Sequence, residues 1–77
     1  MTEDERRNLW RAISSRIMPG KGGMKVFCEE AGLDRSSVYN WVRGKSDPEW
    51  KSLKTLADGL HMPLLNLLSE ILNGRNR

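Results

Sequence analysis

The sequence predicts an all-α fold, a compact five-helix bundle built as a single domain. Five segments place apolar residues three and four positions apart, which is the spacing that lines one face of a helix. A glycine or a proline bounds each of these segments. No alternating run of four or more residues appears, so no segment is typical of a strand. The 77 residues have room for one modest core, and we assign the domain to residues 1–74 and a polar tail to residues 75–77.

The first helix is expected over residues 3–18. Thr2 and Glu5 have the spacing of a capping box, in which each side chain binds the backbone N–H of the other residue. Pro19 and Gly20 then end the helix. Its apolar stripe consists of Leu9, Ile13 and Ile17, widened by Trp10.

Two short helices joined by a tight turn are expected over residues 24–31 and 35–43. Gly32 suits the left-handed position that follows a helix. Asp34 is a good N-cap for the second helix, which Gly44 closes. Because so few residues separate the two helices, they must cross steeply, as in a helix-turn-helix. The inward positions of the pair are Phe27, Cys28, Ala31, Leu33, Val38 and Trp41.

A fourth helix is expected up to residue 60, with Asp47 as its N-cap and Pro48 in its first turn. Its apolar stripe, which we expect to lie in the core, consists of Trp50, Leu53, Leu56, Ala57 and Leu60. The fifth helix begins at Pro63 and ends at Gly74.

The fifth helix carries more apolar residues than a single face can hold. One stripe can seal the core of the domain, and the surplus is exposed unless it meets a partner. We therefore expect a homodimer through this helix, although a first helix that wraps around it with Trp10 is an alternative. The expected dimer interface consists of Leu65, Leu68, Ile71 and Leu72.

Composition argues against several classes of function. No apolar run approaches the ~20 residues that cross a bilayer. The charged N-terminus lacks a signal-peptide segment, so we expect a cytoplasmic protein. With Cys28 and His61 as the only cysteine and histidine, no intrachain disulfide, metal site or catalytic acid–base pair can be assembled. We expect no enzyme activity, no cofactor and no small-molecule ligand.

The distribution of charge is more informative than the net charge of +3. Basic residues gather in or beside the helix pair, and the acids of the first turn, Glu3, Asp4 and Glu5, are expected far from it. After Asp34 the second helix of the pair carries no acid. Its outward residues, Arg35, Ser36, Ser37, Tyr39, Asn40 and Arg43, offer the donors and acceptors that contact base edges and phosphates. The pattern favours double-stranded DNA as the partner.

The pattern over residues 24–68 resembles the phage repressor and Cro type of helix-turn-helix domain, also called lambda-repressor-like. The matching positions are Phe27 and Cys28, Gly32 to Asp34, the polar residues 35–37, Val38 and Trp41, Arg43 to Lys45, Pro48, and the Leu-rich segment 53–60. Three residues depart from the family pattern. Cys28 stands for the usual alanine, Met24 for a phosphate-binding glutamine, and Arg43 for an asparagine.

The resemblance implies a transcriptional regulator, most simply a repressor that binds a palindromic operator as a dimer. It places base contacts at Arg35, Ser36 and Asn40, with Ser37 and Tyr39 at the margins. We expect phosphate contacts from Lys21, Lys25, Arg43 and Lys45, helped by the N-terminus of the helix over 24–31. The alternative function is a small helical protein-interaction module, an antitoxin or adaptor, that acts through its apolar fifth helix.

Overall fold

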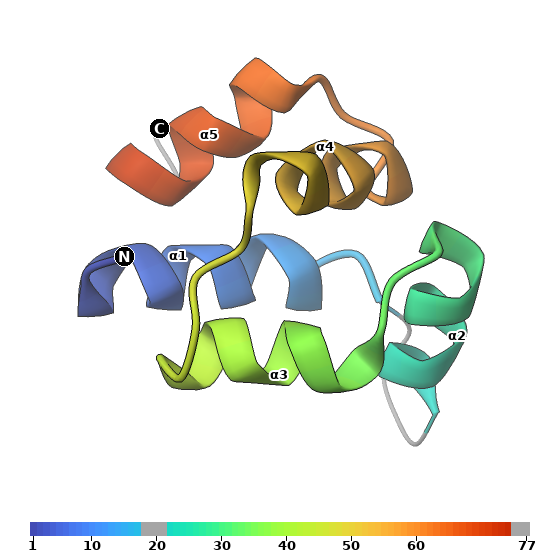
Figure 1. Cartoon of the computed structure of the whole chain (residues 1–77). Helices are drawn as coiled ribbons and strands as arrows, with labels where there is room; N and C mark the ends of the chain where they lie inside the picture. The colour runs from blue at the N-terminus through green and yellow to red at the C-terminus, as the bar shows by residue number, and fades with distance from the viewer. Residues whose placement is uncertain (18–21, 75–77) are drawn as a thin grey trace.

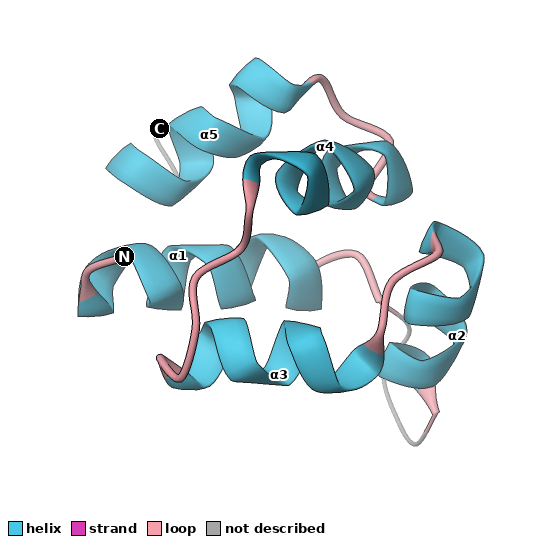
Figure 2. Cartoon of the chain, viewed as in Figure 1, coloured by secondary structure: helices cyan, strands magenta, loops and turns pink. Residues whose placement is uncertain are grey.

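The computed structural model describes residues 1–17 and 22–74, and these residues form five α-helices with no strand among them. The helices are α1 (Glu3–Ser14), α2 (Gly23–Ala31), α3 (Arg35–Arg43), α4 (Trp50–Gly59) and α5 (Leu64–Asn73). Figure 1 shows α1 in the middle, with α3 on one side and α4 and α5 on the other, while α2 lies across one end of α3. The all-α prediction is confirmed (Figure 2). None of the described helices is both long and apolar enough to span a bilayer.

One core joins the helices. Leu9 and Ile13 of α1 are fully buried, and so are Val38 of α3, Leu56 of α4 and Leu67 of α5. Burial of a side chain of this size contributes about 1.5–3 kcal/mol. Because each of these helices contributes at least one such residue, the helices stabilise one another.

α1 begins as predicted and ends earlier. The side chain of Thr2 accepts from the N–H of Glu5 at 3.1 Å, and the N–H of Thr2 donates to the Glu5 carboxylate at 2.8 Å, so the capping box is confirmed. The helix ends at Ser14 and not at residue 18. Ser15 donates its hydroxyl to the carbonyl of Ala12 at 3.1 Å; such a bond competes with the backbone ladder of the helix. The predicted stop signals lie among residues 18–21, outside the described part of the chain.

α4 begins at Trp50, later than predicted, with Glu49 as its N-cap and no side-chain cap. Asp47, the predicted cap, is used elsewhere. Its carboxylate accepts from the N-terminal ammonium of Met1 at 2.8 Å. The contact with the N-terminus thus holds Asp47 outside the helix, and the chain between Asp47 and Trp50 does not form a first helical turn.

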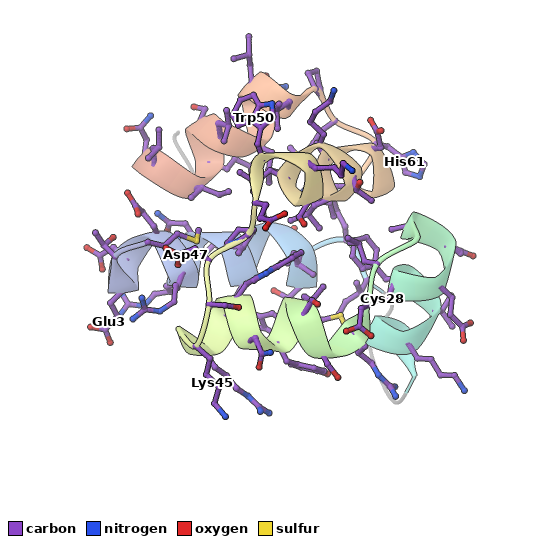
Figure 3. All side chains as sticks on the ribbon, viewed as in Figure 1. Glu3, Cys28, Lys45, Asp47, Trp50 and His61 are labelled. Carbon is purple, nitrogen blue, oxygen red and sulfur yellow. The ribbon has the colours of Figure 1, made fainter. Side chains whose placement is uncertain are left out.

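The prediction that Trp50 lies in the core is wrong, because its side chain is 61% exposed. Leu56, Ala57 and Leu60 of the same apolar stripe are buried, and Leu53 is half-buried. Trp50 is the first residue of α4, so the stripe continues past the part of the helix that covers the core (Figure 3).

α5 directs one of two neighbouring apolar stripes inward. Leu67 and Ile71 are buried, and Asn8 of α1 donates its side-chain N–H to the carbonyl of Ile71 at 3.0 Å. Ile71 is only 4% exposed, so its assignment to a dimer interface is wrong. The surplus stripe is carried by Leu65 and Leu72, which are 78% and 63% exposed. The alternative in which α1 covers every apolar residue of α5 is therefore also excluded.

α2 and α4 approach each other closely at Gly59. A Cβ atom added to this glycine would lie 2.5 Å from the Cβ of Ala31 and 3.6 Å from a ring carbon of Phe27. Real Cβ contacts are not that short, so the absence of a side chain at Gly59 sets the distance between the two helices.

We expect Gly59→Ala to lower the free energy of unfolding by about 1–3 kcal/mol, because the added methyl group overpacks this contact. Urea denaturation measures the change. The double variant Ala31→Gly/Gly59→Ala moves the methyl group to the other helix and should regain most of the loss. If the double variant loses the sum of the two single losses, the contact does not set the helix spacing.

Candidate nucleic-acid interface

The turn between α2 and α3 is fixed by local bonds on both sides. Gly32 has φ 77°, the left-handed conformation that glycine adopts without strain, and its N–H donates to the carbonyl of Cys28. The N–H of Leu33 donates to the same carbonyl at 2.9 Å. Asp34 then caps α3, because its carboxylate accepts from the N–H of Ser37 at 3.3 Å. The predicted bounds and caps of α3 are confirmed.

The inner side of α3 holds the helix against the bundle. Val38 is fully buried and Trp41 nearly so, while Leu33 packs against the core from the turn. These residues fix both the position of α3 and its rotation about its own axis. The predicted structural role of Leu33, Val38 and Trp41 is consistent with this packing.

Cys28 behaves as a small core residue. Its side chain is buried, and its Sγ lies 3.6 Å from the Sδ of Met24 (Figure 3). Burial raises the pKa of the thiol; Arg35 opposes this rise, and Asp34 adds to it. A thiol that is buried and has a raised pKa is a poor nucleophile, in keeping with a packing role.

The outer side of α3 presents five polar or aromatic side chains to solvent. Arg35, Ser36 and Arg43 are exposed, and Tyr39 and Asn40 are half-buried. The guanidinium of Arg43 lies over the ring of Tyr39, 5.4 Å from the ring centre, in a cation–π contact. We call this set the α3 outer face: Arg35, Ser36, Tyr39, Asn40 and Arg43.

Ser37, a predicted base contact at the margin, lies beside this face and is already engaged. Its hydroxyl donates to the Asp34 carboxylate at 3.2 Å, and its side chain is half-buried. It also lines a small depression with Lys51 and Thr55 of α4. Ser37 therefore contributes to the cap of α3 in this structure.

The C-terminal end of α3 carries the next candidates for phosphate contact. The carbonyl of Asn40 accepts from the N–H groups of Gly44 and Lys45, which turns the chain out of the helix. Lys45 is exposed and extends away from the bundle (Figure 3). Behind the turn lies Arg6 of α1, whose Nε would be 2.9 Å from a Cβ added to Gly44.

At the other end of the pair, Lys25 is exposed in the first turn of α2. Among the described residues, no side chain caps the N-terminus of this helix, where the first backbone N–H groups have no partner within the helix. Lys21, the fourth predicted phosphate contact, lies outside the described residues. The described candidates for phosphate contact thus lie at both ends of the α2–α3 pair.

The prediction that the N-terminal acids lie far from the helix pair is wrong for Glu3. Glu3 lines the groove between α1 and α3 together with Tyr39 and Arg43, because α1 runs alongside α3 (Figure 3). The position of Glu3 in the sequence gave no indication of this packing.

The same groove contains residues that were not predicted to have a functional role. Arg6, Arg7 and Trp10 of α1 face Tyr39, Val42 and Arg43 of α3 across a groove of about 480 Å³. The α1 residues follow a helical spacing that sequence analysis can detect. Which helix they would face depends on tertiary packing.

In residues 1–17 and 22–74, no three His, Cys, Asp or Glu side chains come together as a metal site would require. The chain matches no protein-family model, and no curated protein or solved structure is significantly similar to it.

We expect Asp34→Ala to lower the free energy of unfolding by about 1 kcal/mol, because α3 loses its N-cap. Asp34→Ser should retain most of the stability, since serine caps about as well as aspartate. Urea denaturation tests both variants. Asp58→Ala removes an exposed carboxylate within α4 and should change stability by less than about 0.5 kcal/mol. Equal losses for Asp34→Ala and Asp58→Ala would contradict a capping role.

Proposed function

We propose that this protein binds double-stranded DNA in a sequence-specific manner and regulates transcription, as a repressor of the phage repressor and Cro type. We also propose that its five-helix fold is of the lambda-repressor-like class. In this proposal α3 enters the major groove and α2 crosses the phosphate backbone.

The observation that carries the proposal is the α3 outer face. This helix surface carries no acid. It lies beside a turn that is held in place by the C-cap of α2 and the N-cap of α3. A helix surface that merely faces solvent has no need of such uniform chemistry, and acids would be tolerated there. Contact with a polyanion explains their absence.

Each residue of the face has a chemically suitable target. Arg35 is exposed and able to donate two parallel bonds to O6 and N7 of guanine. Asn40 is able to make the equivalent pair of bonds with N6 and N7 of adenine. Ser36 is short and reads a base weakly, and Tyr39 suits a thymine methyl group or a phosphate. Ser37 is secondary, because its hydroxyl is engaged by Asp34.

Phosphate contacts set the register of the helix on the duplex. Lys25 at the first turn of α2 and Lys45 after α3 are exposed near opposite ends of the pair. Arg43 suits a phosphate because its guanidinium lies over the ring of Tyr39 and is exposed at the end of α3. Contacts at both ends would hold α3 along the groove and leave its N-terminal half to read bases.

A single reading helix gives limited specificity, so we propose that two copies bind a palindrome. Leu65, Leu68 and Leu72 form one stripe on α5, of which the first and last are exposed and Leu68 is half-buried. The stripe is small compared with a standard interface of about 800 Å² per partner. We therefore expect the dimer to be completed on the operator.

The same leucines favour a second candidate function, a protein-interaction module of the antitoxin or adaptor kind. In that case a different protein would cover α5, and the chemistry of the α3 outer face would be incidental. Binding to duplex DNA distinguishes the two functions.

We expect the protein to bind a labelled random duplex in about 50 mM salt and to bind it much more weakly in about 200 mM salt. Selection from a random duplex pool should then yield a palindromic site. Arg35→Ala should weaken binding to this site by about 1–3 kcal/mol per half-site and relax one base position in each half. Fluorescence anisotropy measures the affinities.

Lys54→Ala is the control, because it removes the same charge from an exposed site of α4 that belongs neither to the α3 outer face nor to the leucine stripe of α5. It should leave the selected sequence unchanged. If the unaltered protein binds no duplex even at low salt, the proposed function is wrong. An unchanged site for Arg35→Ala would refute only the role of Arg35.

The double variant Leu65→Glu/Leu72→Glu tests the dimer. We expect its affinity for the palindrome to fall about tenfold or more, because each copy brings two charges into the interface. Its affinity for a duplex with one half-site should not change, since both leucines are exposed in the monomer. Asn66→Glu, an exposed position off the stripe, is the control. Equal losses on both duplexes would contradict pairing through α5.

A further inference from the structure

The groove between α1 and α3 is a surface that the contacts assigned above leave largely unused. Its lining residues are Glu3, Arg6, Arg7 and Trp10 from α1 and Tyr39, Val42 and Arg43 from α3. Tyr39 and Arg43 also belong to the α3 outer face, so the groove is continuous with the proposed reading surface. We call it the α1–α3 groove.

The charged residues that line the α1–α3 groove are predominantly cationic. Arg6, Arg7 and Arg43 line it, against the single acid Glu3. Arg7 pairs with Asp4 at 3.1 Å, but both side chains are largely exposed, and exposed pairs of this kind contribute little stability. A phosphate can replace Asp4 at little cost.

Arg6 is held more firmly. It donates to the carbonyl of Met1 at 2.8 Å, is half-buried and lies against the backbone at Gly44. A guanidinium has five N–H donors, so Arg6 has donors left for a second acceptor. Its position beside Gly44 brings α1 next to Lys45, a proposed phosphate contact.

The other residues that line the groove are apolar or aromatic. Trp10 is 39% exposed, and Tyr39 and Val42 are half-buried beside it. The indole N–H of a tryptophan and the hydroxyl of a tyrosine are hydrogen-bond donors, and their rings pack against apolar CH groups. A strand of DNA matches both kinds of group, since the faces of its deoxyribose are apolar and its phosphates are anionic acceptors.

We propose that the α1–α3 groove is a second phosphate-binding surface, which receives the sugar–phosphate strand that flanks α3 in the major groove. This inference rests on the proposed function and adds α1 to the interface. Arg7 and Arg6 bind phosphates, and Trp10 packs against the sugars between them. The positive charge of the groove lining and its continuity with the α3 outer face favour a nucleic-acid strand over a protein segment.

The test measures how the affinity for the selected duplex depends on salt. Each lost phosphate contact lowers the magnitude of the slope of log K against log salt concentration by about 0.9. Because two copies bind the palindrome, Arg7→Gln removes one contact per copy, and we expect the magnitude to fall by about 1.8. Arg7→Lys should retain the slope because the charge remains. Arg7 is exposed, so both variants should fold, which thermal denaturation checks.

Arg11→Gln is the control, since Arg11 lies one turn further along α1 and does not line the groove. A loss of slope for Arg7→Gln with none for Arg11→Gln supports the proposal. An unchanged slope for Arg7→Gln, or an equal loss in both variants, overturns the role of the groove and leaves the proposed function standing. Absence of any duplex binding by the unaltered protein overturns both.

Discussion

The rotation of α3 about its own axis is the constraint on which the candidate interface depends. Val38 and Trp41 are buried, and Asn40 immediately precedes Trp41. Successive residues on a helix are about 100° apart, so a slip of one residue would bury the amide of Asn40 and expose an indole. A buried amide without partners costs about 1–3 kcal/mol, to which the lost burial of Trp41 is added. Two apolar residues therefore determine which polar residues face outward.

α1 connects this face to the rest of the molecule. Leu9 and Ile13 are fully buried, and α1 packs against both α3 and α5. The polar face of α3 and the leucine stripe of α5 are thus held in a fixed relation by a helix between them (Figure 1). In the proposed function this arrangement matters, because a dimer can read two half-sites only when its contact surface and its reading surface do not move independently.

The parts of the fold that the sequence predicted correctly are those determined locally. The bounds of α3 follow from Asp34 and Gly44, and the capping box of α1 follows from a spacing of three residues. The start of α4 was predicted incorrectly because Asp47 bonds to Met1, 46 residues away. No local pattern contains that information.

In the candidate site, too, the features set by local pattern were predicted and those set by tertiary packing were not. The exposure of Arg35 and Ser36 follows from helical periodicity once Val38 and Trp41 are placed inside. The burial of Ile71 does not follow from periodicity, because α5 carries two neighbouring apolar stripes. Packing against α1 and α4 selects between them. The groove residues on α1 were missed for the same reason. Their periodicity is visible in the sequence, whereas the helix they face is not.

The size of the domain limits how the proposed dimer can read DNA. The described residues extend over 28 × 27 × 23 Å along the principal axes of the Cα atoms. Two copies in contact therefore have centres about one domain width apart. Half-sites one helical turn apart are separated by about 34 Å, which is slightly more than this distance. The two α3 helices must therefore lie slightly farther apart than the centres of the two copies. A separation of two turns, about 68 Å, exceeds twice the longest extent of 28 Å, so direct pairing through α5 is compatible only with the shorter spacing.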